Sequence, residues 1–196
     1  MRVSTAIALV TVSVLLVITA AAGVCAAERL KISGDCGTIE FVGSKDDGSH
    51  KGGFKEFSGE VTLNPEGPSL SDLVIEIKTT SLWSDDPKLT AHLRTADFFH
   101  IDKFPNAVFR STAVRKAEEQ DRKAAENMKA THVIQGKLTL LGVTREIDVP
   151  VTVTPSDASL GIRGDYRLDR TQFGMEYGAG KIHDEVKVSF ALKIPR

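Results

Sequence analysis

The side chains best suited to metal binding or acid–base chemistry are five histidines and two cysteines, and their spacing favours neither use. No two histidines form an HxH, HxxxH or HExxH pattern, and Cys25 and Cys36 lie eleven residues apart. Zinc sites use closer ligand spacings than these. We therefore expect no metal site, and we expect surface or capping roles for the histidines. The histidines are His50, His92, His100, His132 and His183.

Sequence signatures of enzymes are also missing. The chain has no GxSxG motif for an activated serine, and no GxGxxG or GxxxxGK[ST] motif for a nucleotide phosphate. The adjacent carboxylates of Asp46 and Asp47 point apart in a strand or turn, as do those of Asp184 and Glu185. Neither pair suits a shared substrate, and nothing nominates a glycosidase-type pair. We expect no catalytic residues, no enzyme activity and no cofactor.

The aromatic residues form a strongly apolar set. Nine phenylalanines accompany two tyrosines and one tryptophan. Four of the nine fall in LRTADFFHIDKFPNAVFRST, residues 93–112, where they surround a Lys-Phe-Pro break. Phenylalanines in such numbers either pack a core or line an apolar cavity, and the sequence leaves both alternatives open.

The N-terminal residues 1–27 have the composition of a secretory signal peptide, with Arg2, an apolar stretch from Ala6 and small residues near Ala27. The apolar stretch is close to the roughly 20 residues that span a bilayer, so an uncleaved anchor is the alternative. We expect a periplasmic or secreted protein whose single domain covers residues 28–196. Membrane contact would be transient or through an uncleaved N-terminal segment. The net charge of −1, with interleaved signs, argues against a nucleic-acid partner.

From Leu30 onward the apolar residues alternate with polar ones, which is typical of half-buried β-strands. In IDVPVTVT, Val149, Val151 and Val153 share one face, and Pro150 suits a sheet edge or a bulge. The pattern predicts eight strands, at residues 38–43, 59–64, 71–82, 106–114, 132–141, 145–154, 160–168 and 185–194. We expect an all-β antiparallel domain, either a sandwich or a barrel whose interior is filled or holds one small ligand.

Two segments depart from the strand pattern. DDPKLTAHLRT, residues 85–95, predicts a short helix, because Asp85 or Asp86 can cap it and Pro87 fits its first position. Residues 115–129 are charged, rich in alanine and without large apolar side chains, which indicates a solvated loop or an exposed helical excursion. We assign this second segment no function.

Several stretches, taken in order, resemble the YceI family of secreted or periplasmic, lipocalin-like barrels associated with polyisoprenoid binding. They are GGFKEFSGEVTLNPEG (52–67), LSDLVIEIKTTSL (70–82), AHLRTADFFHIDKFPNAVFRST (91–112), GKLTLLGVTREIDVPV (136–151), LDRTQFGM (168–175) and HDEVKVSFALKI (183–194). The 91–112 block is the most specific. Asp169 and Gln172 stand where family members commonly carry asparagine and aspartate, which puts the rim and the ligand head group in doubt.

The resemblance implies an eight-stranded antiparallel lipocalin-like β-barrel with a short helix at one end, preceded by an N-terminal signal helix. It also implies an apolar cavity near the Phe98-Phe99 turn and Phe104-Pro105, which fasten the helix to the barrel. Candidate cavity residues are Phe41, Phe54, Leu93, Phe98, Phe99, Phe109, Phe173 and Phe190. Arg94 and Arg170 are candidates for a phosphate or quinone oxygen of the head group, because guanidinium donates in a planar fork. A structural tie to backbone carbonyls or an aspartate is an equal alternative for both.

By this resemblance the protein holds a long-chain polyisoprenoid, a quinone or a similar amphiphile for transport, storage or stress protection, without covalent chemistry. Burial of each methylene group of such a chain contributes about 0.8 kcal/mol, so tight binding needs no charged contact. Two other classes stay open. One is an envelope protein-interaction module with a filled barrel, and the other is an enzyme with acid–base residues on the same barrel. A homodimer is compatible with all three.

Overall fold

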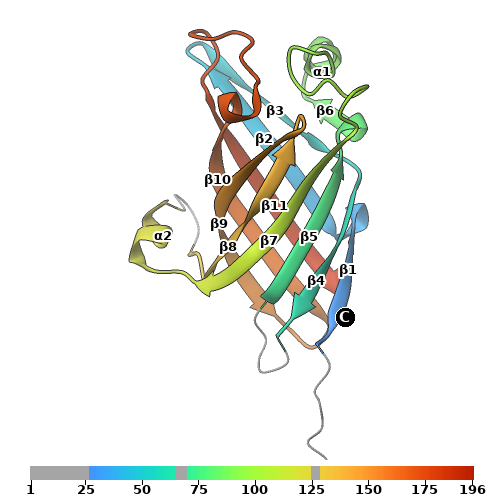
Figure 1. The fold of residues 1–196 in the computed structure, drawn as a ribbon, viewed down its shortest axis with the longest axis vertical. Coiled ribbons are helices and arrows are strands. Elements are labelled where there is room, and N and C mark those ends of the chain that lie inside the picture. Colours follow the sequence, from blue (N-terminus) through green and yellow to red (C-terminus); the bar gives the residue numbers. More distant parts are fainter. Residues whose placement is uncertain (1–26, 65–69, 125–128) are drawn as a thin grey trace, which may run out of the picture.

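The computed structural model describes residues 27–64, 70–124 and 129–196, which form one antiparallel sheet of eleven strands (Figure 1). The strands are β1 Arg29–Ser33, β2 Gly37–Lys45, β3 Gly48–Phe54, β4 Phe57–Leu63, β5 Leu70–Lys78, β6 Leu82–Ser84, β7 Asn106–Lys116, β8 His132–Leu140, β9 Val143–Pro155, β10 Ser159–Asp169 and β11 Glu185–Pro195. The expected all-β antiparallel fold is confirmed. The expected signal segment lies outside the described residues, apart from Ala27.

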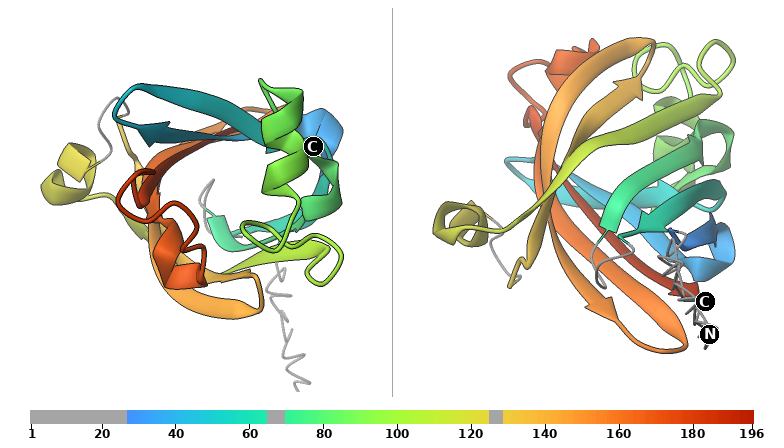
Figure 2. Two further views of the ribbon diagram at one scale, coloured as in Figure 1. Left: turned by 90° about the horizontal axis from the view of Figure 1, so that it is seen from above. Right: turned by 60° about the horizontal axis from the view of Figure 1, so that its bottom comes forward.

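The sheet curls into a barrel because three pairs of consecutive strands are bent parts of one extended segment. β1 runs into β2 through the 3-10 turn Gly34–Cys36, β3 runs into β4 through residues 55–56, and β5 runs into β6 through the 3-10 turn Thr79–Ser81. In the sheet order β1-β4-β5-β7-β8-β9-β10-β11-β2-β3-β6, the members of each pair lie near opposite ends. The bends therefore bring the two ends of the sheet together, and Figure 2 shows the resulting ring from above.

The expected count of eight strands does not hold, since the described residues form eleven strands that occupy eight extended segments. The sequence pattern does not predict β1 and β3, and its strand at residues 71–82 joins β5 to the start of β6. The sequence of β3, GSHKGGF, shows no apolar alternation, because its glycines make room for aromatic rings instead. A Cβ atom on Gly52 would lie 2.5 Å from the ring of Phe41. The position of β3 thus depends on the aromatic rings that pack on its glycines, and its own side chains give no strand pattern.

One half of the barrel, near the C-terminus at the bottom of Figure 1, is packed solid with aliphatic side chains. We call this the filled half. Its central residues, which have no exposed surface, are Val61, Val151, Leu160, Ile162 and Ile194. Val149 and Val153 lie in the same core, so the face predicted for IDVPVTVT is confirmed.

The short helix expected over residues 85–95 is present as α1, Pro87–Leu93, at the top of Figure 1. Asp86 is its N-cap, and the Asp86 carboxylate accepts hydrogen bonds from the backbone N–H of Lys88 (2.7 Å) and Leu89 (2.9 Å). These bonds satisfy two of the amides that a helix leaves without partners at its start. Leu93 is buried and directs the helix onto the barrel.

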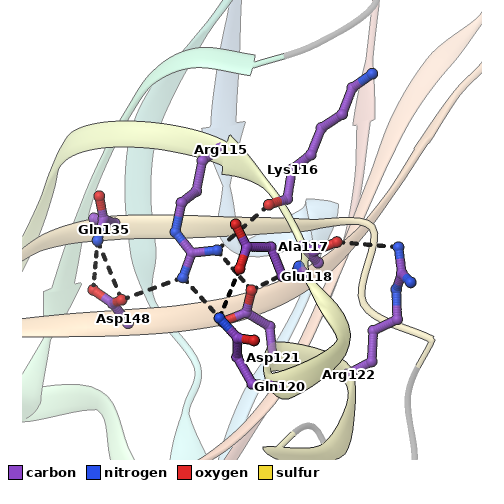
Figure 3. A network of polar contacts seen from close by, with 9 residues as sticks. All are labelled: Arg115, Lys116, Ala117, Glu118, Gln120, Asp121, Arg122, Gln135 and Asp148. Carbon is purple, nitrogen blue, oxygen red and sulfur yellow. Dashed lines mark hydrogen bonds and ion pairs between the residues drawn. The ribbon is translucent and has the colours of Figure 1, made fainter.

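The charged segment 115–129 includes a helix, α2 Glu119–Ala124, outside the barrel wall, in line with the expected excursion, and residues 125–128 lie outside the described residues. Figure 3 shows the polar network that holds the helix. Arg115 at the end of β7 donates to both carboxylate oxygens of Asp121 (2.6 and 2.9 Å), and it lies 3.7 Å from Asp148 on β9. The hydrogen bond from Arg115 lowers the pKa of Asp121 to about 2. The network therefore ties α2 to the barrel.

The barrel wall is split between β9 and β10 in its upper half. These strands pair only from Val151 to Pro155 on β9, and β9 above this stretch pairs with β8 alone. Pro150 lies at the first position beyond the last β9–β10 pair, which fits the edge position predicted for it. The 3-10 turn η3, Arg170–Phe173, lies against β9 there. A separate element therefore covers the gap that strand pairing leaves.

Candidate ligand-binding cavity

The half of the barrel beneath α1 encloses an apolar cavity of about 420 Å³. We call this the hollow half. Leu89 and Leu93 of α1, together with Met175 and Ile182 of the segment 174–184, border the cavity at its mouth. In Figure 2, α1 and the segment after β10 lie over the upper opening of the ring. The cavity therefore has strand walls and a partial cover made by helix and loop.

Three phenylalanines from different parts of the chain meet on one wall. Phe41 of β2 and Phe54 of β3 have ring centroids 5.9 Å apart. Phe99 lies 5.9 Å from the Phe41 ring and packs edge-on against Phe54 at 5.5 Å. Offset and edge-to-face contacts of this kind stabilise aromatic groups beyond the area they bury. The aromatic block of residues 93–112 therefore reaches the cavity by contributing Phe99 to this group.

The segment after α1 is fastened at both ends, as the resemblance implies. The backbone N–H of Phe99 donates to the carbonyl of Leu93 (3.0 Å). At the other end, the Thr79 hydroxyl donates to the carbonyl of Phe104 (2.6 Å), and the Thr79 N–H donates to that of Pro105 (2.9 Å). Thr79 is itself only 1 % exposed. These bonds hold the aromatic turn against the barrel rim.

The structure places seven of the eight candidate cavity residues at the cavity surface, and their contact with a ligand stays a prediction. The seven are Phe41, Phe54, Leu93, Phe98, Phe99, Phe109 and Phe190. Phe173 does not border the cavity, and its placement there needs correction. Its side chain is 1 % exposed and belongs to the apolar cluster that includes Leu140 of β8. The η3 turn directs Phe173 into the covering of the β9–β10 gap.

Arg94 does not border the cavity either. It follows α1 directly, and its guanidinium donates to the backbone carbonyl of Leu82 (2.9 Å) and, at the limit of a hydrogen bond, to that of Thr80 (3.5 Å). These contacts join the end of α1 to β6. The structural tie that the sequence left open is therefore the geometry found for Arg94.

Arg170 borders the cavity, but its guanidinium is committed to the protein. The side chain is 4 % exposed, and five hydrogen bonds match the five N–H groups of a guanidinium. The acceptors are the backbone carbonyls of Met175, Tyr177, Ile182 and His183 and the carboxylate of Asp184. Arg170 thus pins the segment 174–184 across the mouth, and no N–H remains for a head group.

Three histidines with surface roles expected from the sequence lie around the mouth, each beside an aspartate. His50 of β3 contacts Asp85, and His50 itself borders the cavity. The pairs are His50 with Asp85 (2.9 Å), His92 with Asp97 (2.8 Å) and His183 with Asp46 (3.1 Å). All six side chains are at least one-third exposed. These pairs join segments of the rim to one another.

Sequence reasoning missed several polar residues that border the cavity, among them Glu40, Ser44 and Lys45 of β2 and Tyr166 on β10. Burial raises the pKa of the Tyr166 hydroxyl to about 12. The residue keeps some accessible surface although it lies inside the barrel, because that surface faces the cavity. The alternation of LGIRGDYRL could have found it, since Leu160, Ile162 and Tyr166 share one face of the strand.

The arrangement suits enclosure of an apolar molecule. Among the described residues, no cluster of three or more His, Cys, Asp or Glu side chains is placed to hold a metal ion. Cys36, the free cysteine in the described part of the chain, is half-buried in the turn between β1 and β2. None of the helices in residues 27–64, 70–124 and 129–196 has the length and apolarity that a membrane crossing requires.

Comparison with known proteins gives consistent matches. The family model for the YceI-like domain matches residues 31–194. A UPF0312 protein of Pseudomonas putida (strain W619) is 36 % identical over 101 residues, which cover 52 % of this chain and 47 % of the relative. Protein YceI of Salmonella arizonae is 36 % identical over 132 residues, covering 67 % and 59 %. The matched part of the chain thus spans about half the length of these curated relatives.

Solved structures share the fold. BcnA of Burkholderia cenocepacia superposes with a TM-score of 0.67 at 23 % identity, covering 82 % of this chain and 97 % of that one. A polyisoprenoid binding domain from Saccharophagus degradans superposes with a TM-score of 0.64 at 16 % identity, covering 87 % and 99 %. The family model covers most of the chain. The chain belongs to the YceI-like family.

Proposed function

We propose that this protein binds a polyisoprenoid or similar amphiphile in the cavity of the hollow half, without covalent chemistry. The observation that carries the proposal is the cavity itself, whose walls are aromatic and aliphatic side chains above a packed floor. Mostly apolar, concave and preformed sites are typical of small-molecule binding. The Saccharophagus degradans neighbour, described as a polyisoprenoid binding domain, supports the same ligand class.

The cavity volume sets how much of a chain can be enclosed. A water molecule occupies about 30 Å³ of liquid, and a methylene group is of similar size, so 420 Å³ holds about 14 such groups. This corresponds to about three isoprene units of five carbons each. We infer that a longer polyisoprenoid extends through the mouth, between α1 and the segment 174–184.

We further propose that the protein acts outside the cytoplasm, in transport, storage or stress protection. The support is the signal-like composition of residues 1–27. N-terminal sequencing of the exported protein tests this. A mature N-terminus near Ala27 or Glu28 is expected, whereas an intact Met1 in a membrane fraction would show that the segment is an anchor.

Mass spectrometry of an organic extract of the natively produced protein tests the ligand. The test variant is Ala107→Phe, and its matched control is Val108→Phe. Ala107 is buried and borders the cavity, whereas its neighbour Val108 points to the opposite face of β7. A polyisoprenoid or similar amphiphile should accompany the wild type and Val108→Phe, and Ala107→Phe should lose it because the new ring occupies the space.

The two other functional classes give different results in the same experiment. An interaction module without a lipid ligand would yield no lipid from any of the three proteins. Its binding to a partner protein would not change in Ala107→Phe. An enzyme would convert the extracted molecule when it is returned to purified protein, and a rim histidine variant would abolish that turnover. Lipid that co-purifies equally with all three proteins would contradict binding in this cavity.

A further inference from the structure

Every basic side chain that borders the cavity is already paired with an aspartate. The pairs are Lys45 with Asp47 (3.0 Å), His50 with Asp85 (2.9 Å) and Arg170 with Asp184 (3.2 Å). Glu40, the acidic residue of the wall, pairs with Lys51 at 2.9 Å. Among the described residues, no charged group that borders the cavity lacks a partner of opposite sign, so a phosphate or a carboxylate would compete with an aspartate for each of these cations.

Two hydroxyl groups of the wall have no hydrogen-bond partner among the described residues, those of Ser44 and Tyr166. Ser44 lies at the mouth, where its backbone carbonyl accepts a hydrogen bond from the N–H of His183 (2.9 Å). The Tyr166 hydroxyl lies below the rim, and burial alone raises its pKa to about 12. It is therefore a neutral hydrogen-bond donor throughout the physiological pH range.

Register places Tyr166 low in the hollow half. Tyr166 pairs with Val188 of β11, which in turn pairs with Phe41 of β2, and all three border the cavity. The next inward-facing position on β10 is Gly164, over which the Phe190 ring lies so closely that a Cβ atom would be 2.2 Å from it. The Phe190 ring thus forms part of the floor one step below the tyrosine, and a group bound to Tyr166 would be enclosed.

We propose that Tyr166 anchors the polar end of the ligand, and that the occupant is an uncharged amphiphile with a carbonyl or hydroxyl oxygen. The proposal rests on the proposed binding function and specifies its ligand class. Tyr166 is the unpartnered donor below the rim, so a ligand oxygen placed elsewhere in the enclosed part of the cavity would lose its hydrogen bond. The head group then lies inside the barrel, and the arginines at the rim have no part in its recognition.

Tyr166→Phe tests the proposal, since it removes one hydroxyl and keeps the ring. Tyr177→Phe is the matched control, because Tyr177 is the other tyrosine of the chain and is 48 % exposed at the rim. Delipidated wild type and both variants are titrated calorimetrically with farnesol, with the hydrocarbon farnesene and with farnesyl monophosphate. All three probes carry the same chain of three isoprene units, close to the capacity of the cavity.

We expect wild type and Tyr177→Phe to bind farnesol more tightly than farnesene or farnesyl monophosphate. Tyr166→Phe should bind farnesol roughly 2- to 12-fold more weakly, the effect of one neutral hydrogen bond, with farnesene binding unchanged. The ultraviolet difference spectrum on adding farnesol should show a tyrosine band in Tyr177→Phe and none in Tyr166→Phe.

Two results overturn the proposal while leaving the binding function intact. One is equal farnesol affinity in wild type and Tyr166→Phe, and the other is tighter binding of the monophosphate than of the alcohol. Failure of the wild type to bind any of the three probes would instead refute the binding function on which the proposal rests.

Discussion

The filled half and the hollow half of the barrel share the same strands but close in different ways. In the filled half, β9 and β10 are hydrogen-bonded, and aliphatic side chains such as Val151 and Ile162 pack into one interior cluster without exposed surface. In the hollow half the two strands part, phenylalanines line the wall, and space remains between them. The pairing between β9 and β10 thus ends where the cavity begins.

The two halves also depend on different interactions. A side chain of the filled half contacts others on all sides, so its removal leaves a void. A side chain of the hollow half already faces open space, so its removal enlarges a cavity that exists. The hollow half is held by polar contacts of its cover, above all those of Arg170, and by the capped helix α1.

The largest effect is expected from Arg170→Met. The substitution leaves up to four backbone carbonyls of the 174–184 segment without their donor, which should lower the free energy of unfolding by about 3 to 5 kcal/mol. Urea denaturation measures the loss, and proteolysis within 174–184 should become faster. Arg163→Met, at an exposed position on β10, is the control and should be near neutral. An unchanged urea midpoint in Arg170→Met would show that the hydrogen bonds of Arg170 do not stabilise the segment 174–184.

Ile162→Ala should lower the free energy of unfolding by about 2 to 5 kcal/mol, because Ile162 is fully buried in the filled half. Denaturation of protein stripped of lipid measures it. Binding of an isoprenoid to the folded fraction should be retained, since Ile162 does not border the cavity. A loss below about 1 kcal/mol would mean that this half is also loosely packed.

Phe99→Ala should destabilise stripped protein by less than the roughly 3 to 5 kcal/mol typical of a phenylalanine in a packed core. Isoprenoid affinity should fall by more than stability does, because the Phe99 ring borders the cavity and packs on Phe41 and Phe54. The comparison needs delipidated protein, since bound lipid raises apparent stability by mass action. If the variant unfolds without ligand yet keeps its affinity, Phe99 is part of the scaffold and not of the site.

The smallest effect is expected outside both halves, at Asp121. Its folded-state pKa is lowered to about 2, so the stability it contributes is present above the pKa of an unfolded aspartate and is lost as pH falls toward 2. Amide signals of α2 should therefore shift between about pH 4 and pH 2 in the wild type. In Asp121→Asn the attachment of α2 to the barrel should be weakened and should no longer depend on pH in this range, and ligand affinity should stay unchanged. A change in affinity would connect this network to the cavity.

Much of the fold follows from local sequence patterns. Alternation in IDVPVTVT predicts which face is buried, and the Asp-Pro start of DDPKLTAHLRT predicts the capped helix, because both signals depend on neighbouring residues alone. The alternation pattern does not predict β3, because its glycines leave space for aromatic rings of other strands. The cluster of phenylalanines in residues 93–112 indicated an aromatic gathering, and the structure adds its partners on β2 and β3.

The order of residue types predicts an antiparallel sheet, a capped helix and a set of inward-facing apolar residues. Which of those residues meet and which face empty space depends on how the strands close into a barrel, because alternation fixes the face of a side chain but not the width of the barrel. The tertiary structure also decided the roles of two polar residues. The acceptors of Arg170 are mostly backbone carbonyls, which leave no trace in side-chain types. Tyr166 borders a mostly apolar cavity, and its hydroxyl has no hydrogen-bond partner among the described residues.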